Sequence, residues 1–281
     1  LLFNAMMLLD CLSVDYEVVG GPGACCGIIQ SKWEGNQGKA EKVVDGTINR
    51  FAGFQPKEVL SWCPSCVLHL GETMSGFRSA SFDFDHVTNY LVERAEGLSK
   101  KFIQPINKRV LLHTHDGMDE VGQNVADLLR SVPGLTLVDL VSEPGYTCGG
   151  SGADRSPALK QVARRKTVAR AEADDVDVLV SLYHGCHGQL AGLQTEAKFE
   201  VLNWTDILVQ ALGQQPYDDV NKRYRMQSDW DMVLDEGEIF LKSNGIHMDR
   251  EWLKGLLPDI FGQTEFKGGL EEFACGREAA E

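Results

Sequence analysis

Residues 59–66 read Val-Leu-Ser-Trp-Cys-Pro-Ser-Cys, a short apolar run that leads directly into a Cys-x-x-Cys motif. Such a run is typical of a buried strand, so Cys63 and Cys66 are expected at the carboxyl end of that strand. Further strands are predicted at 16–19, 110–113, 135–140 and 176–181, and amphipathic helices at 39–51, 87–98, 121–129 and 158–171. Short strands that alternate with helices long enough for crossovers predict an α/β fold with mainly parallel sheets.

The chain contains this arrangement twice. In each half, one predicted strand leads through a glycine-containing loop to a cysteine motif, and a later strand leads to a second motif. The motifs are Cys25-Cys26-Gly27 and Cys63-Pro64-Ser65-Cys66 in the first half, and Thr147-Cys148-Gly149 and Tyr183-His184-Gly185-Cys186 in the second. We infer two similar pseudo-repeated units with metal-binding loops at the C-terminal ends of their strands. Their expected bounds are 1–105 and 106–213, followed by an acidic C-terminal extension at 214–281 with a helix at 249–257.

Composition and charge narrow the class of protein. The chain has 281 residues, with 27 Lys and Arg against 41 Asp and Glu and a formal net charge of −14, which argues against nucleic acid and anionic lipid as partners. No uncharged apolar run reaches the length of about eighteen residues that a membrane span needs. The apolar start, 1–11, lacks the features of a secretory signal and does not begin with Met, so we expect a further segment upstream. Eight cysteines in close pairs without such a signal favour metal or redox chemistry in a reducing, cytoplasmic setting.

The first half offers four cysteines for one metal site: Cys25, Cys26, Cys63 and Cys66. Thiolates are soft ligands that suit iron–sulfur clusters and zinc. Glycines before Cys25 allow a tight loop, and ligands of open α/β sheets sit beyond the carboxyl ends of the strands. We therefore expect these side chains to surround one redox metal cluster. The alternatives are a closed structural zinc site and cysteines that serve only as small buried apolar side chains.

These motifs, the doubled layout and the closing Cys186-His187 resemble the cysteine-rich, or CCG, domain family, typified by the cysteine-rich subunit of heterodisulfide reductase. The resemblance covers most of residues 1–212. It implies cysteine-ligated clusters, often non-cubane 4Fe-4S clusters, that reduce or form disulfides. It also implies other iron–sulfur and flavin subunits as partners in a complex, and a thiol, a disulfide or a sulfur carrier as substrate.

The sequence departs from the family pattern at two places. The family places a further cysteine ligand well upstream of the adjacent pair, but Cys11 is too close to Cys25, so we expect Cys11 to pack within a helix. In the second half only two thiolates remain at the motif positions, which excludes a full five-cysteine cluster. A mixed nitrogen and sulfur site for zinc or a smaller cluster is one hypothesis, with the ligands His115, Cys148, Cys186 and either His184 or His187. The others are a site that has lost its metal and a pair, Cys148 and Cys186, that exchanges with a thiol or persulfide.

Three functions are compatible with these observations. The leading hypothesis is a heterodisulfide reductase-like subunit that acts on disulfide, thiol or sulfane sulfur, with sulfur oxidation made plausible by the degenerate second half. The second is an electron-relay subunit, as in related lactate or glycolate oxidation complexes. The third is a zinc-stapled scaffold for partner subunits.

Overall fold

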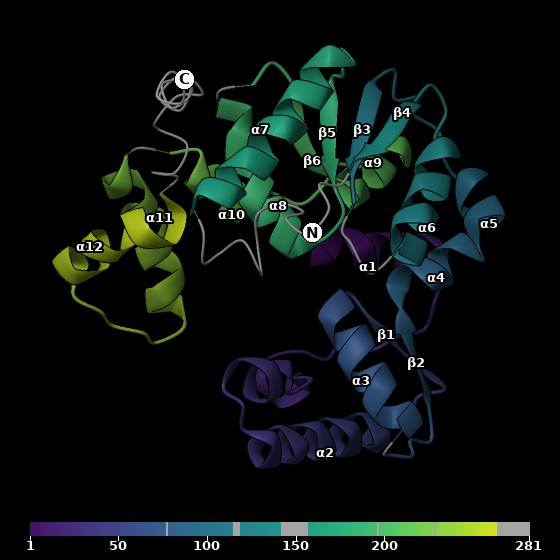
Figure 1. Ribbon diagram of the computed structural model, residues 1–281, viewed down its shortest axis with the longest axis vertical. Coiled ribbons are helices and arrows are strands. Elements are labelled where there is room, and N and C mark those ends of the chain that lie inside the picture. Colours follow the sequence, from purple (N-terminus) through teal and green to yellow (C-terminus); the bar gives the residue numbers. More distant parts are fainter. Residues whose placement is uncertain (77, 115–118, 142–156, 196, 228, 263–281) are drawn as a thin grey trace, which may run out of the picture.

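The computed structural model describes residues 1–76, 78–114, 119–141, 157–195, 197–227 and 229–262 (Figure 1). Within these residues the chain forms two separate parallel sheets with helices packed around them. The α/β class with mainly parallel sheets that the sequence predicts is therefore confirmed.

The smaller sheet belongs to the first unit and lies in the lower part of Figure 1. It pairs β1 (Glu58–Ser61) with β2 (Asp83–His86) in parallel, so that Ser61 lies opposite His86 at the carboxyl end. Two helices accompany it, α2 (Gln37–Gly53) and α3 (Pro64–Gly76). Their apolar faces close a small core made of Cys26, Val44, Ile48, Phe51, Leu70 and Phe82. The adjacent cysteine pair is thus built into the core of the first unit through Cys26.

The larger sheet belongs to the second unit and has the strand order β4-β3-β5-β6. Its strands are β3 (Arg109–His113), β4 (Thr136–Val141), β5 (Val178–Ser181) and β6 (Glu200–Asn203). Figure 1 shows α7 (Pro157–Ala173) and α8 (His184–Leu190) on one face and α6 (Asp119–Arg130) on the other, where α9 (Trp204–Ala211) packs against α6. Every residue of β5 is buried, as expected for a central parallel strand covered on both faces.

Helices from the first hundred residues also pack on the larger core. These are α1 (Leu2–Cys11), α4 (Val87–Val92) and α5 (Ala95–Ser99). Leu8, Leu91 and Leu98 are fully buried in the same cluster as the strands of the larger sheet. In addition, Asn4 Nδ2 donates a hydrogen bond of 2.5 Å to Asp206 Oδ1 on α9. The two units therefore share a core, and the division at residue 105 stays a prediction from the sequence.

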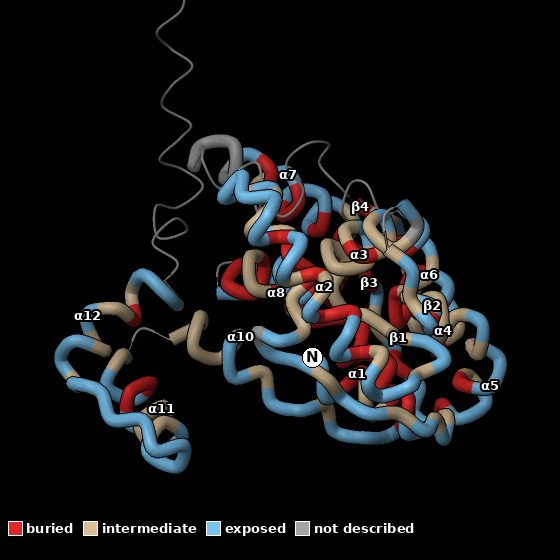
Figure 2. The backbone as a smooth tube through the Cα atoms, turned by 90° about the horizontal axis from the view of Figure 1, so that it is seen from below, coloured by how far each residue is buried: buried red, intermediate tan, exposed pale blue. Residues whose placement is uncertain are grey.

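Within its described residues the C-terminal extension forms three helices, α10 (Val220–Arg225), α11 (Trp230–Ser243) and α12 (Arg250–Phe261). The helix predicted at 249–257 lies in α12. Val233, Leu234 and Leu257 form a small core of their own, and Figure 2 shows α11 and α12 largely exposed and apart from the main body. Among the described helices, none has both the length and the apolar character that crossing a membrane requires.

Two elements differ from the sequence prediction. Residues 16–19 form no strand, because the segment has no neighbouring strand to pair with among the described residues and leaves Val18 55% exposed. The helix predicted at 87–98 is divided into α4 and α5, because Arg94 leaves helical geometry and its Nη1 bonds the Tyr90 carbonyl at 3.0 Å. The strands predicted at 59–62, 110–113, 135–140 and 176–181 are present as β1, β3, β4 and β5.

Candidate metal centre

The loop that bears the adjacent cysteines is held against α2. A 3₁₀ turn, Pro22–Ala24, precedes Cys25, and Thr47 Oγ1 on α2 donates a hydrogen bond of 2.6 Å to the Cys25 carbonyl. Gly27 has a φ of +75°, and a Cβ there would lie 3.0 Å from the Ala40 carbonyl oxygen of the same helix. A side chain at Gly27 would therefore strain the backbone and press on α2, so glycine sets the approach of the loop.

The second cysteine motif joins β1 to α3. Ser61, the last residue of β1, accepts a hydrogen bond of 3.1 Å from the Cys63 N–H. Pro64 begins α3, where its missing N–H and fixed φ suit the first turn, and the Cys66 N–H bonds the Cys63 carbonyl at 3.1 Å. Both cysteines thus lie at the N-terminus of a helix, whose dipole favours the thiolate form of a cysteine.

Three of the four cysteines influence one another across these two loops. Cys66 is the hydrogen-bond partner that sets the pKa of both Cys26 and Cys63. This hydrogen bond is the largest influence on both acceptors and outweighs burial, so it lowers the pKa of Cys63 to about 6 and that of Cys26 to about 7. The same contacts and burial raise the pKa of Cys66, which keeps its proton. A metal bound to these sulfurs would displace the Cys66 proton.

Cys25 is half-buried beside this group, and its sulfur accepts a hydrogen bond of 3.5 Å from the Gly27 N–H. Among the described residues, no three His, Cys, Asp or Glu side chains are already arranged as a metal site. Cysteine sulfur is nevertheless the donor chemistry that soft metals require, and Cys63 and Cys66 are only half-buried. The residues fit a cluster or a metal ion that draws the sulfurs into its coordination sphere.

The profile of the CCG family, described as a cysteine-rich domain, matches residues 5–71 and 113–191, which together exceed half of the chain. The chain belongs to the CCG cysteine-rich domain family. This family is one of iron–sulfur, metal-binding redox proteins, and its two matched regions agree with the predicted duplication. The comparison with curated proteins gave no match.

Only part of the site predicted for the second CCG region falls within the described residues. His115 and Cys148 lie outside them, and Cys186 is buried in α8. His187 is buried as well, but its Nδ1 lies 2.8 Å from Ser181 Oγ and its Nε2 lies 2.7 Å from Asp219 Oδ2. A metal bound to His187 would have to displace Ser181 or Asp219. In this structure His187 instead joins α8 to Asp219, the N-cap residue of α10. The second metal site stays a prediction.

The second CCG region also borders the first site. The exposed His184 is among the groups that lower the pKa of Cys63. Burial is the main cause that raises the pKa of Tyr183, and the charges of Cys186 and Cys63 add to it. Sequence reasoning considered His184 only as a ligand of the second site and assigned no role to Tyr183. The one signal for Tyr183 was that it occupies the position of Cys63 in the repeat.

A histidine of the first unit lies opposite Ser61 at the end of the small sheet. His86 ends β2, is 2% exposed, and its Nδ1 lies 2.8 Å from Thr88 Oγ1. Burial lowers its pKa to about 4, against the opposing effect of the Trp62 backbone. The ring is therefore neutral at physiological pH.

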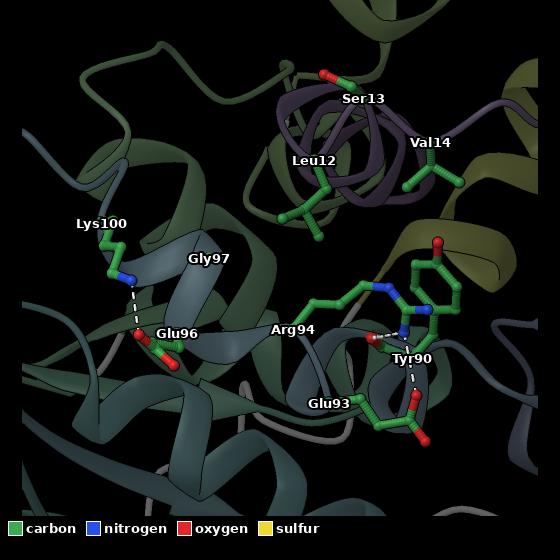
Figure 3. A pocket seen from close by; sticks show the side chains of 9 residues that line it. All are labelled: Leu12, Ser13, Val14, Tyr90, Glu93, Arg94, Glu96, Gly97 and Lys100. Atoms are coloured by element: carbon green, nitrogen blue, oxygen red, sulfur yellow. Dashed lines mark hydrogen bonds and ion pairs between the residues drawn. The ribbon is translucent and has the colours of Figure 1, made fainter.

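The structure also has a shallow pocket of about 450 Å³ between the end of α1 and helices α4 and α5 (Figure 3). Its charges are paired internally, since Arg94 bonds Glu93 at 3.1 Å and Lys100 bonds Glu96 at 2.6 Å. None of the four candidate ligands lines it. This pocket is therefore separate from the candidate metal centre.

Proposed function

We propose that this chain is a heterodisulfide reductase-like iron–sulfur subunit that performs thiol/disulfide or sulfane-sulfur redox chemistry. Cys25, Cys26, Cys63 and Cys66 would hold a 4Fe-4S cluster, of the cubane or the non-cubane type. The observation that carries the proposal is that Cys66 shifts the pKa of both Cys26 and Cys63, which belong to two different motif loops. Membership of a family of iron–sulfur redox proteins supports it.

The surroundings of the cysteines are compatible with chemistry at the site. A bound cluster supplies or accepts single electrons next to a sulfur substrate. Cys25, Cys63 and Cys66 are half-buried, which leaves a route for a small thiol, while Cys26 is fixed in the core. Conversion of a disulfide into two thiols consumes two electrons and two protons, so partner iron–sulfur or flavin subunits would exchange the electrons.

The same donor set also suits zinc, and a cluster could relay electrons without touching a substrate. These alternatives correspond to the scaffold and the lactate- or glycolate-type relay. Six cysteines fall within the described residues, and all six are free thiols, which supports a reducing, cytoplasmic setting within the proposal. The degenerate second region favours a reaction that needs one cluster, which is why sulfur oxidation is included.

The test is the iron, acid-labile sulfide and zinc content of the full chain purified without oxygen, compared with two matched variants. The wild type is expected to hold about four irons and an equal amount of sulfide, with a paramagnetic signal that changes when a thiol is added. Cys63→Ser should lose the iron. Cys11→Ser should keep it, because Cys11 ends α1 and packs against the larger core.

Each contrary result points to a different conclusion. Full iron content in the Cys63→Ser protein would refute the ligand assignment. Zinc without iron would replace the redox proposal by the scaffold. A normal iron content with a signal that ignores added thiols and persulfides would favour the electron relay.

A further inference from the structure

Helix α12 carries two adjacent stripes of apolar side chains, each repeating every four residues. The inner stripe packs in the small core between α11 and α12 and consists of Leu253, Leu257 and Phe261. The outer stripe consists of Trp252, Leu256 and Ile260. At about 100° per residue the two stripes together cover about half of the helix circumference, which is wider than an ordinary surface helix buries.

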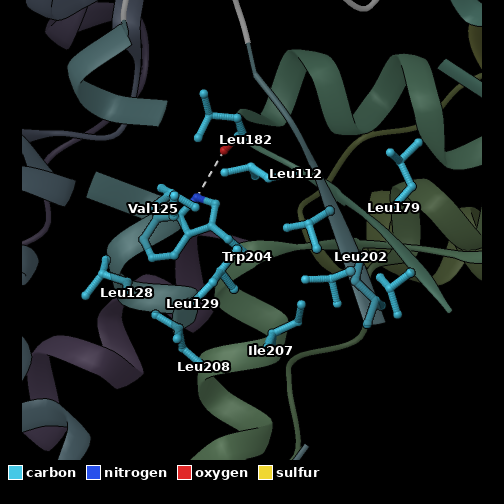
Figure 4. Close-up of a cluster of buried hydrophobic side chains, with 14 of the residues drawn as sticks. Leu112, Val125, Leu128, Leu129, Leu179, Leu182, Leu202, Trp204, Ile207 and Leu208 are labelled. Carbon is cyan, nitrogen blue, oxygen red and sulfur yellow. Dashed lines mark hydrogen bonds between the residues drawn. The ribbon is translucent and has the colours of Figure 1, made fainter. Parts of the chain in front are cut away.

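The outer stripe is not covered by any of the described residues. Trp252 is 53% exposed and Ile260 is 49% exposed, and neither belongs to a hydrophobic cluster of the described chain. The larger core shows the contrast, since Trp204 is 1% exposed there and its indole Nε1–H donates a hydrogen bond of 3.0 Å to the Leu182 carbonyl (Figure 4). The indole N–H of Trp252 makes no hydrogen bond within the described residues. Trp252 therefore has both apolar area and a donor left for a partner.

The pair of helices α11 and α12 buries little apolar surface by itself. Of the described residues, Val233, Leu234 and Leu257 alone are fully buried in its core, and the pair spans 230–261, below the length of about 40 residues at which folding without further support becomes rare. Seven of the seventeen exposed large apolar side chains of the described chain lie within 230–262, although this segment is a small part of it. Such a concentration is typical of an interaction surface.

Helix α10 fixes this pair to the second CCG region. Arg223 on α10 forms an ion pair of 2.5 Å with Glu236 on α11, and the ring of Tyr224 packs edge-on against Phe261 on α12 with centroids 5.3 Å apart. The N-cap residue of α10 is in turn bonded to α8. The outer stripe is therefore held at a defined place on the protein, which lowers the entropic cost of binding a partner there.

The charges around the outer stripe indicate the kind of partner. Each basic residue of α11 and α12 is already paired with an acid of α11; these residues are Lys242, Arg250 and Lys254. Glu251 precedes Trp252, and Asp259 lies seven positions after it and so on the same face of the helix. Neither carboxylate forms an ion pair within the described residues. Lys or Arg side chains would complement them, whereas a second copy of this chain, with its formal net charge of −14, would bring the same acids to the interface.

We propose that the outer stripe of α12 is a docking site for a basic amphipathic helix of another protein, which would turn the pair α11 and α12 into a three-helix bundle. Side chains four residues apart form the ridges that pack into the grooves of a neighbouring helix. Trp252 would anchor the apolar contact, and Glu251 and Asp259 would pair with Lys or Arg at its border. The inference is independent of the metal group, because it uses residues of the C-terminal extension alone.

The experiment measures binding of a fluorescent peptide to the full chain by anisotropy. The probe is a helical peptide of about eighteen residues made of Leu and Lys, with Leu on one face, and the negative probes are its scrambled form and a Leu–Glu counterpart. We expect one peptide per chain, bound more weakly at higher salt. Trp252→Ala should raise the Kd about tenfold or more, as loss of a tryptophan anchor does. Phe54→Ala is the matched control, because Phe54 is a comparably exposed aromatic side chain (48%) at the end of α2, and it should leave the Kd unchanged.

Glu251→Gln combined with Asp259→Asn should also weaken binding and reduce its salt dependence. The control, Asp15→Asn combined with Glu17→Gln, removes the same charge at two exposed positions after α1 and should change neither. Equal affinity of the wild type and Trp252→Ala, or equal binding of the scrambled peptide, would overturn the proposal. So would a wild-type dimer in sedimentation that Trp252→Ala makes monomeric, which assigns the face to a second copy. Protection of Trp252 from hydroxyl radicals in the monomeric chain without peptide would overturn it as well, because this chain would then cover the stripe itself.

Discussion

Asp219 connects the C-terminal extension to the second CCG region, and replacing it with Asn measures the strength of that connection. Its Oδ2 lies 2.7 Å from His187 Nε2, and its Oδ1 accepts the Lys222 N–H at 2.9 Å as the N-cap of α10. Asparagine caps a helix about as well as aspartate does. Asp219→Asn therefore keeps the cap and removes only the negative charge that faces His187.

The size of the effect follows from the pKa of this carboxyl group. Burial raises the pKa of Asp219, but the hydrogen bond and charge of His187 and the Lys222 N–H outweigh burial and lower it from 3.8 to about 2. A shift of this size corresponds to about 2.4 kcal/mol, and solvent screening of a carboxylate that is only partly buried reduces the expected loss to about 1–2 kcal/mol. Because the pKa is lower in the folded state, this stabilisation is present above pH 3.8 and is lost as the pH falls through 2.

The assay is urea unfolding of the metal-free chain under reducing conditions, at pH 5 and at pH 7. The carboxylate is ionised in the folded and unfolded states at both values, so a loss in unfolding free energy is expected at each. Asp218→Asn is the matched control, because its side chain is 62% exposed and its ion pair with Arg223 should contribute less than about 1 kcal/mol. A loss for Asp219→Asn no larger than that of the control would refute the connection.

Two further predictions concern the first CCG region. Leu70→Ala should lower the unfolding free energy by about 2–5 kcal/mol, measured by urea unfolding, because Leu70 is 1% exposed in the small core. It should also reduce the iron content, measured by metal analysis, because α3 carries both Leu70 and Cys66. Gly27→Ala should destabilise by more than about 1 kcal/mol because of its positive φ, whereas Gly46→Ala, in an open position on α2, should stabilise slightly. Equal thermal shifts for the two glycine variants would contradict the role given to Gly27.

The sequence predicted the strands that are marked by a continuous apolar run. The apolar run at 59–62 became β1, and Cys63 follows it as expected. The residues at 16–19 have a composition favourable to strands, yet strand formation depends on a neighbouring strand, and the segment has none among the described residues. Its Tyr16 hydroxyl instead donates a hydrogen bond of 2.8 Å to Asp10, so the segment is an extended link from α1.

The contacts between the two units were beyond sequence reasoning. The stacking of Trp62 on Trp204 joins residues far apart in the chain, and neither tryptophan stands in a motif. The strands β2 and β6 were also missed. β2 alternates acidic and aromatic side chains before His86, so it lacks the apolar run that marks β1 and β5. Candidate ligands could be identified from spacing alone.

The two CCG regions differ in what holds their motif loops in place. In the second region the loop before α8 is fixed by Asn203 and Trp204, and the sheet beneath it has four strands, so its geometry persists without a full ligand set. In the first region the sheet has two strands of four residues each, and a parallel pair of that size is marginal by itself. Ligation of Cys26 and Cys66 would join the core-bound loop to α3 and so stabilise this small unit directly. Hydrogen bonds therefore hold the motif loop before α8 in the second region, whereas in the first region metal ligation would couple to folding.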